Sequence, residues 1–284
     1  MRPVSEAAIR VRGLRKSYGE HEAVRGIDFE VAAGEVFGFL GPNGAGKTTT
    51  IEILEGYREP SGGEVSVLGA DPSKPTRAWR ERVGLVLQEC ELDPLLTVRE
   101  AVALFATFYA APRPVEETIE LTGLGPKRDA RIGSLSGGQK RRVDVAVGIV
   151  GDPDLIFLDE PTTGFDPTAR REAWKMIEGL KALGKTVFLT THYMDEAQHL
   201  ADRVAILRDG RIVAQGSIDE LGERLKPTTT IECVLGGERI AIESERPQED
   251  LRRLFARADE LGTEVSELEV WRPSLEDVFL EATR

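Results

Sequence analysis

Residues 41–49 of this 284-residue chain, GPNGAGKTT, match the phosphate-binding pattern G-x-x-x-x-G-K-[ST]. An apolar run precedes the segment and an apolar, helix-like stretch follows it, as that pattern requires. The glycines let backbone N–H groups turn inward around phosphate oxygens, and the positive end of the following helix adds to the attraction. The sequence therefore predicts a site for a nucleoside triphosphate and Mg²⁺. The expected phosphate-binding residues are Gly41, Pro42, Asn43, Gly44, Ala45, Gly46, Lys47, Thr48 and Thr49.

Polar residues of chemical interest also follow several other short apolar runs. Runs of this kind are typical of strands that are buried on both faces of a parallel sheet. Because ligands of open α/β sheets bind at the carboxyl ends of the strands, these residues should converge on one edge of one sheet. Run 36–40 leads into the glycine-rich segment, and run 83–87 leads into Gln88. Run 155–158 leads into Asp159 and Glu160, and run 187–189 leads into Thr190, Thr191 and His192.

The predicted metal ligands are Thr48, Asp159 and Gln88. Lys47 is expected to reach the β- and γ-phosphates, while the Thr48 hydroxyl binds Mg²⁺. Asp159 resembles the carboxylate at a strand end that holds Mg²⁺ through water in phosphate-transferring proteins. Gln88 is expected to contact Mg²⁺ or the attacking water. Taken singly, Asp159 would be an ordinary turn residue and Gln88 a surface residue.

Glu160, His192 and Gln88 are the predicted catalytic residues. A carboxylate beside the metal site can orient water toward the γ-phosphate, so Glu160 is the candidate general base. His192 is expected to bond the γ-phosphate; alone, it would be read as a surface histidine. Tyr18 is expected to stack on a base, a contact worth about 1–3 kcal/mol, or else to be a partly buried strand tyrosine.

A second glycine-rich turn, LSGGQ at residues 135–139, precedes the helix-like stretch KRRVDVAVGIV. Ser136 is placed to cap that helix, and the N–H groups of Gly137 and Gly138 would form an anion site with it. This turn has no lysine and no metal carboxylate of its own. It therefore suits the exposed face of a phosphate held elsewhere. The expected ligand-binding residues here are Ser136, Gly137, Gly138 and Gln139.

The elements around these residues predict an α/β fold: a nucleotide-binding core with a parallel sheet and an antiparallel β flank. Residues 91–150 form an inserted helical subdomain, and residues 221–284 form a small α+β appendage to domain 1–220. The flank spans 7–33 in short strand-like pieces, and the insertion holds helices at about 98–110 and 114–122 and after LSGGQ. The appendage is predicted as a hairpin (229–234 and 238–242), a helix (249–261), a strand (264–270) and a final helix (273–282).

Composition excludes some function classes. The net charge of -12 lacks the basic field of a nucleic-acid binder. Cys90 and Cys233 lie far apart and are expected as reduced thiols. The longest mostly apolar run, 101–111, is too short to span a bilayer. With no apolar run like a signal peptide at the start, the chain is expected to be cytoplasmic.

Taken together and in this order, the motifs resemble those of the ATP-binding subunits of ABC transporters over about residues 5–220. In the D-loop (163–166), Phe165 stands before the aspartate where many relatives have leucine, and both side chains are apolar. The closing stretch WRPSLEDVFL (271–280) and GGQKRRVDVA are similar to exporter ATPases of the daunorubicin-resistance type. The matching motifs are Walker A (41–49), a Gln loop (Gln88), LSGGQ (135–139), Walker B with its glutamate (155–160), a D-loop (163–166) and a His switch (His192).

The resemblance implies how the two glycine-rich turns are used. In this family two subunits pack head to tail, and the LSGGQ of each closes on the ATP held by the other. It also implies MgATP hydrolysis that drives a separate membrane permease, with the chain peripheral on the inner face of the membrane. Multidrug or antibiotic export, or export of a lipid-like molecule, is the expected process.

Two other functions share most of these motifs. An importer ATPase would have the same chemistry and another permease, and the appendage argues against it. A soluble ABC ATPase acting on ribosomes or DNA usually has two cassettes or long coiled-coil arms, and this acidic chain has neither. A neighbouring gene for a membrane protein of about six apolar helices would separate the classes.

Overall fold

The computed structural model describes residues 7–86, 92–224 and 229–271. The chain divides into two compact units, Met1–Ile218 and Asp219–Arg284, which are considered separately. None of the described helices is long and apolar enough to cross a membrane. Gln88, Cys90 and the predicted helix 273–282 lie outside the described residues.

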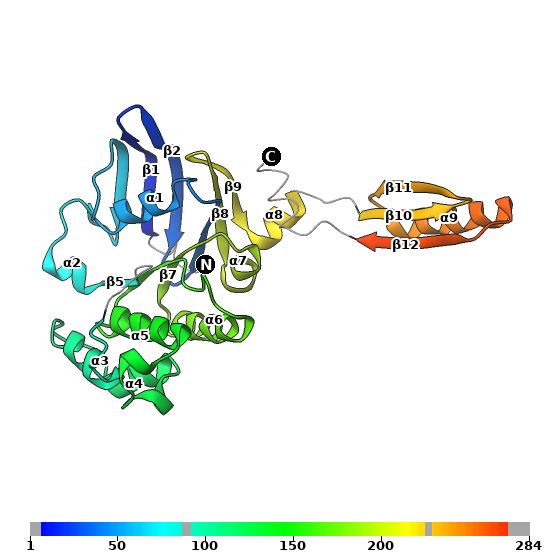
Figure 1. The fold of residues 1–284 in the computed structure, drawn as a ribbon. Helices are drawn as coiled ribbons and strands as arrows, with labels where there is room; N and C mark the ends of the chain where they lie inside the picture. Colours follow the sequence, from blue (N-terminus) through cyan, green and yellow to red (C-terminus); the bar gives the residue numbers. More distant parts are fainter. Residues whose placement is uncertain (1–6, 87–91, 225–228, 272–284) are drawn as a thin grey trace, which may run out of the picture. The chain divides into compact units, whose positions relative to one another are not determined.

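The first unit is built around a six-stranded sheet in the order β5-β6-β7-β3-β8-β9 (Figure 1). The first five strands of this order are parallel, as predicted, and only the edge strand β9 is antiparallel to its neighbour. In the register, Leu40 lies beside Thr191 and Asp159 lies beside Thr190, so three strands end at the same edge. The strands are β3 (Val36–Leu40), β5 (Val83–Val86), β6 (Leu155–Asp159), β7 (Thr186–Thr191), β8 (Arg203–Arg208) and β9 (Arg211–Ser217).

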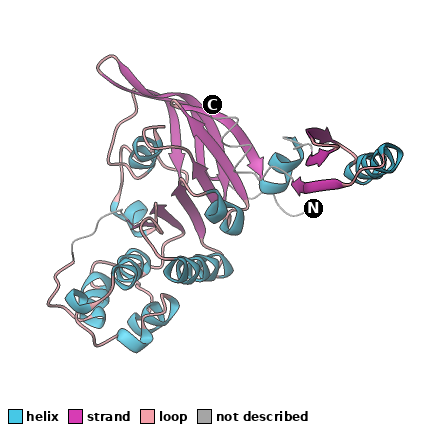
Figure 2. Ribbon diagram, turned by 45° about the vertical axis from the view of Figure 1, so that its right-hand side comes forward, coloured by secondary structure: helices cyan, strands magenta, loops and turns pink. Residues whose placement is uncertain are grey.

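The predicted antiparallel flank is a separate three-stranded sheet in the order β2-β1-β4. Strands are drawn in magenta in Figure 2. Instead of short pieces, it contains two twelve-residue strands, β1 (Ala7–Tyr18) and β2 (His21–Ala32), with β4 (Gly62–Val67) at the edge. Register shifts interrupt the pairing of β1 with β2. Gly13 and Gly26 have positive φ angles of 55° and 79°. Such breaks in the pairing disturb the alternation that identifies a strand in the sequence, which is why the strands looked shorter than they are.

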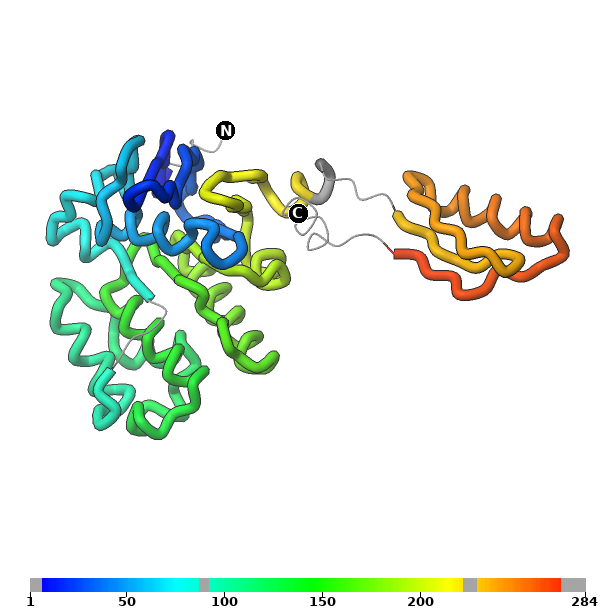
Figure 3. Tube along the Cα trace, turned by 45° about the horizontal axis from the view of Figure 1, so that its top comes forward, coloured from blue at the N-terminus to red at the C-terminus, as the bar shows by residue number. Residues whose placement is uncertain are grey.

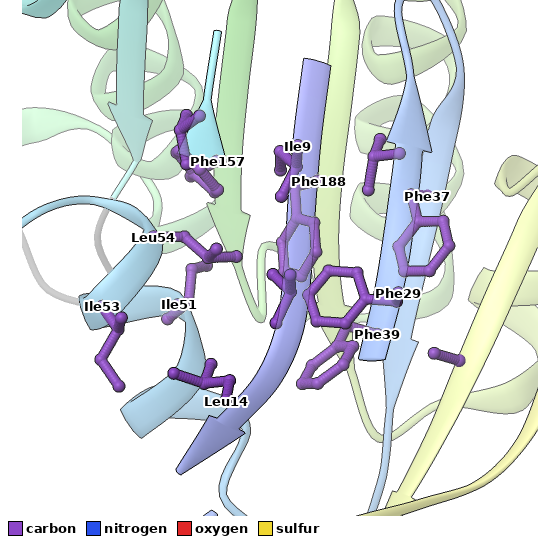
Figure 4. Packing of buried hydrophobic residues seen from close by; sticks show 14 of the residues in the cluster. Ile9, Leu14, Phe29, Phe37, Phe39, Ile51, Ile53, Leu54, Phe157 and Phe188 are labelled. Atoms are coloured by element: carbon purple, nitrogen blue, oxygen red, sulfur yellow. The ribbon is translucent and has the colours of Figure 1, made fainter. Parts of the chain in front are cut away.

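The core explains why the central strands are apolar throughout. Phe37, Phe39 and Phe188 face β1, β2 and helix α1 (Lys47–Leu54), where Phe29 packs among them with ring centroids 5.5–6.0 Å apart (Figure 4). The alternate residues of the same strands, such as Leu189, face helices on the opposite side. Because both faces are covered, every position along these strands is buried, and the sequence shows runs instead of alternation.

Helices cover the second face of the sheet and form the inserted subdomain. Residues of α5, α6 and α7 pack against β6 and β7. The insertion has its own core among α3, α4 and α5, and two of its helices are shorter than predicted. The helices of the first unit beyond α1 are α2 (Arg77–Glu81), α3 (Val98–Ala106), α4 (Val115–Leu121), η1 (Gly125–Lys127), η2 (Ile132–Ser134), α5 (Gly137–Ile149), α6 (Pro167–Ala182) and α7 (Met194–Leu200).

The second unit is a three-stranded antiparallel sheet with one long helix along it (Figure 3). The hairpin turns at Gly236 and Gly237, both with positive φ, as a two-residue turn of the primed type requires. Cys233 and Leu254 are buried together between sheet and helix. The elements are α8 (Ile218–Arg224), β10 (Thr229–Leu235), β11 (Glu238–Ser244), α9 (Pro247–Leu261) and β12 (Val265–Trp271), in sheet order β11-β10-β12.

Candidate functional site

The glycine-rich segment is a tight loop between β3 and α1. Gly46 has a φ of 102°, and a Cβ atom there would meet the Ala23 carbonyl oxygen at 2.5 Å, so only glycine fits. Lys47 is 4 % exposed, and its Nζ donates to the Gly41 carbonyl at 2.7 Å and the Pro42 carbonyl at 3.3 Å. The loop therefore holds an ammonium group among backbone atoms at the head of a helix.

The nucleotide cavity, as we call it, is a hollow of about 280 Å³ beside this loop. It is also lined by Tyr18, the proposed base-stacking residue, and by His21, which the sequence did not single out. Lys16 Nζ and the Arg58 guanidinium lie 5.4 Å and 5.2 Å from the centre of the Tyr18 ring. The remaining lining residues are Ala23, Asn43, Gly44, Gly46, Lys47, Thr48, Thr49 and Glu160.

Glu160 lies close to two other predicted site residues, Lys47 and His192. Its Oε1 is 3.4 Å from Lys47 Nζ and 3.4 Å from His192 Nδ1. Burial by itself would raise the pKa of Glu160, but the Lys47 ammonium and His192 outweigh it, so the pKa is lowered. The carboxylate is therefore ionised at neutral pH, as a general base that takes a proton from water must be.

Glu160 also has a strained backbone. Its φ is 44°, which is uncommon for a residue with a side chain and which clusters at functional sites. Its N–H donates to the carbonyl and the hydroxyl of Thr190, at 3.2 Å and 3.0 Å. Thr190 thus fixes the turn that aims Glu160 toward Lys47.

Asp159 ends β6 and is only 8 % exposed. Burial raises its pKa, against a hydrogen bond from the Thr190 hydroxyl that lowers it. The Arg141 side chain donates to the Asp159 carbonyl at 2.8 Å. Thr48 lines the nucleotide cavity with Lys47 and Glu160, whereas Asp159 is not among the residues that line it. A hydroxyl and a carboxylate are both hard oxygen ligands that suit Mg²⁺.

The LSGGQ turn belongs to a different hollow, the signature cavity, of about 820 Å³. Ser136 caps α5 as predicted: its hydroxyl accepts from the Gln139 N–H at 3.3 Å, and Gln139 Oε1 accepts from the Ser136 N–H at 3.1 Å. Gly137 and Gly138 line the cavity from the start of the helix. Of the described residues, Glu160 alone lines both the signature cavity and the nucleotide cavity.

Sequence reasoning missed several residues that support the site. Thr190 had a visible signal, because it lies near the end of β7, two residues before His192, but it was given no role of its own. Arg141 had none, because a buried arginine in the stretch KRR looks like a solvated helix face. The acceptor it finds, the carbonyl of Asp159, is brought to it only by the packing of α5 on the sheet.

The chain is similar to proteins of known family over nearly its whole length. A family model described as ABC transporter matches residues 24–163. The Nod factor export ATP-binding protein I of Rhizobium sp. (strain N33) is 39 % identical, and the match covers 99 % of this chain and 98 % of that protein. Its counterpart in Burkholderia lata is 40 % identical over 98 % of this chain and 97 % of that protein.

Solved structures give the same result at lower identity. A structure described as the ATP-binding subunit of an ABC transporter is 27 % identical, with a TM-score of 0.68, over 77 % of this chain and 93 % of that one. A dimeric bacterial ABC transporter cassette is 26 % identical, with a TM-score of 0.64, over 74 % of this chain and 98 % of that one. Through these relatives and its P-loop core, the chain belongs to the ABC transporter family, as an ATP-binding subunit of the kind that hydrolyses ATP.

Proposed function

We propose that this chain is the ATPase of an exporter and works with a separate membrane permease. The observation that best supports the ATPase part of this proposal is the placement of Glu160 Oε1 at 3.4 Å from both Lys47 Nζ and His192 Nδ1. An ammonium, an imidazole and a carboxylate meet there at the edge of a sheet, beside the glycine-rich loop that is proposed to bind the phosphates. This is the set of groups that phosphoryl transfer to water needs.

In the proposed reaction, ATP lies with its phosphates against the loop and its base against Tyr18. Lys47 turns from the Gly41 and Pro42 carbonyls toward the β- and γ-phosphates. Glu160 accepts a hydrogen bond from the attacking water and orients it toward the γ-phosphate, and His192 donates to a γ-phosphate oxygen. Mg²⁺, held by Thr48, by Asp159 and by Gln88, would neutralise charge on the phosphate oxygens when bound.

We further propose that two copies of the chain form two ATP sites between them. The separation of the cavities supports this, because Lys47 and Ser136 line different hollows of one chain. The donors at the start of α5 would then meet the γ-phosphate of ATP bound to the other copy. Asp166, whose carboxylate accepts from the N–H groups of Thr168 and Ala169 at 2.8 Å and 2.9 Å, would lie at the same interface.

The permease is proposed to dock on a third hollow, the docking groove, of about 340 Å³. It combines apolar and aromatic walls, including Tyr57, Phe105 and Tyr109, with the carboxyl of Glu55. Burial, and then the charges of Asp159 and Glu52, raise the pKa of Glu55 to about 8. Because this raised pKa leaves Glu55 largely uncharged at neutral pH and Arg80 also lines the groove, a permease segment that presents apolar side chains would fit better than a basic one.

Export is favoured over the alternatives by the relatives, which are named for Nod factor export. Import and a soluble role on ribosomes or DNA share the ATP chemistry and differ in the partner. A drug, an antibiotic or a lipid-like molecule is the proposed cargo. The proposal that the exporter is of the daunorubicin-resistance type rests on sequence similarity at the start of α5 and in residues 271–280. Of residues 271–280, the structure describes only Trp271.

The proposed function is tested by purifying the chain with the membrane protein encoded beside its gene. We expect the two to copurify and the membrane protein to change the rate of MgATP hydrolysis in vesicles. Tyr57→Ala should weaken copurification while the isolated chain still hydrolyses ATP. A chain that hydrolyses ATP but binds ribosomes and no membrane protein would support the soluble alternative instead.

A further inference from the structure

Glu196, in α7, is a fully buried carboxylate that none of the roles above requires. Its exposed fraction is 0 %. Its Oε1 accepts from the Thr162 hydroxyl at 2.8 Å and from Trp174 Nε1 at 3.3 Å. Among the described residues its Oε2 has no hydrogen-bond partner. Burial raises the pKa of this carboxyl, against its polar neighbours Thr191, Thr162 and Trp174, which lower it.

Such a group is costly for stability. A buried polar atom without a partner costs about 1–3 kcal/mol, and more if it is charged. An apolar side chain of similar length would fill the same space, and replacing buried charged groups in this way is often neutral or stabilising. A packing role therefore does not account for a glutamate at this position. The two hydrogen bonds to Oε1 indicate a different role for this side chain.

The bonds of Glu196 join the segments that carry the two proposed catalytic side chains. Thr162 is two residues after Glu160, and Glu196 is four residues after His192. Thr162 is itself 0 % exposed. The segment with Glu160 and Thr162 is therefore joined twice to the segment with His192 and Glu196. One link is the Glu196–Thr162 hydrogen bond, and the other is the 3.4 Å contact between His192 Nδ1 and Glu160 Oε1.

Trp174, the other donor to Glu196 Oε1, connects the Glu196–Thr162 hydrogen bond to α6. Trp174 donates to Glu196, and its ring stacks on His199 of α7 with centroids 4.5 Å apart. Helix α6 begins at the cap residue Asp166, which we place at the interface between copies. One carboxylate thus holds the segment after Glu160, the helix after Asp166 and the helix after His192.

We propose that Glu196 is a positioning residue for ATP hydrolysis, which holds His192 against Glu160 through its hydrogen bond with Thr162. It rests on the roles proposed above for Glu160 and His192. Glu196 itself touches neither ATP nor the attacking water. It acts by fixing the distance between the segment that carries Glu160 and the segment that carries His192. Small displacements of catalytic groups slow enzymes by up to about 10²-fold.

The test compares Glu196→Met, which removes both acceptor oxygens at similar volume, with Thr162→Val, which removes the donor. Each should lower kcat by between about 10-fold and 10²-fold, with the affinity for MgATP unchanged. Melting temperatures should be unchanged or, for Glu196→Met, raised. The double variant should be no slower than the slower single variant, because both remove one bond. Glu196→Gln keeps one acceptor oxygen and should retain most of the wild-type kcat.

Glu178→Gln is the matched control. Glu178 is a half-exposed α6 carboxylate whose Oε1 lies 3.3 Å from His199 Nε2, so its loss alters the same pair of helices without touching Thr162. Its kcat should equal that of the wild type. Unchanged kcat in folded Thr162→Val or Glu196→Met, or losses that multiply in the double variant, would overturn the proposal.

His192→Ala separates this proposal from the one it rests on. If His192→Ala lowers kcat, adding Glu196→Met to it should cause little further loss, since nothing remains to be positioned. A full additional loss would show that Glu196 acts elsewhere. If His192→Ala and Glu160→Gln both leave kcat unchanged, the proposed catalytic roles fail, and the positioning role fails with them.

Discussion

Lys47 Nζ and Glu160 Oε1 lie 3.4 Å apart, although one follows β3 and the other follows β6. The strand between β6 and β3 in the sheet is β7, whose end leads to His192. Three neighbouring strands thus bring a cation, a carboxylate and an imidazole together. In this arrangement Lys47 lowers the pKa of Glu160, and phosphate oxygens that attract Lys47 would free the carboxylate for water.

Glu160→Gln should leave ATP binding intact and slow hydrolysis by roughly 10²–10⁴-fold, the usual contribution of a positioned general base. The amide has the same shape but cannot accept a proton. Bound ATP would then persist, so the variant should collect as an ATP-dependent dimer. Size-exclusion chromatography and a phosphate-release assay measure both effects. Wild-type turnover in this variant would remove Glu160 from the mechanism.

Lys47→Ala should weaken nucleotide binding itself, because it removes the buried cation that faces the phosphates. The effect is measured as the loss of affinity for a fluorescent ATP analogue. Lys74→Ala removes a lysine whose side chain is 84 % exposed, and it should bind like the wild type. Normal affinity together with normal turnover in Lys47→Ala would contradict the assignment of the phosphate site.

Gly137→Asp should bind ATP through its own Lys47 and fail to dimerise. A new carboxylate would face a γ-phosphate, and like charges in a water-poor interface repel strongly. A Cβ atom at Gly137 meets nothing within 4 Å, so Gly137→Ala is a matched control that should dimerise. If Gly137→Ala is as defective as Gly137→Asp, charge is not the cause.

Mixing variants tests which pocket the LSGGQ turn completes. Gly137→Asp mixed with Lys47→Ala forms one composite site from intact Lys47 of the first chain and intact Gly137 of the second. Partial ATPase activity should reappear if one working site turns over alone. A photo-crosslinker at Ser136 gives a readout that does not depend on turnover: with ATP it should label residues 41–49 of the other copy. Labelling confined to its own chain would defeat the head-to-tail arrangement.

Glu55 should make the stability of the first unit depend on pH. Its pKa is raised from 4.5 to about 8, so the folded state favours the protonated form and loses stability as the pH rises between these values. Glu55→Gln abolishes this loss, and its melting temperature should exceed that of the wild type at about pH 8.5 and by much less at about pH 5. Glu64→Gln, which removes an exposed carboxylate, should show no such difference. An equal gap at both pH values would show that Glu55 does not titrate between them.

The amino-acid sequence by itself determined the features that depend on neighbouring residues. The phosphate loop is set by glycines and a lysine within nine positions, and the start of α5 by Ser136 and Gln139 three residues apart. Strands buried on both faces are visible as apolar runs, since no position along them meets water. Hence the parallel strands and the helices after residue 97 were predicted correctly, and the residues of the ATP site stay a prediction.

The tertiary structure decided which of these segments touch. The distance from Glu160 to Lys47 follows from the order β6-β7-β3, which no local pattern encodes. Arg141 finds its acceptor, and Glu196 finds Thr162, only when helices pack on the finished sheet. The assignment of Lys47 and Ser136 to separate cavities has the same origin. Local chain sterics fix caps, turns and strands, whereas contacts between distant segments depend on the packing of the whole core.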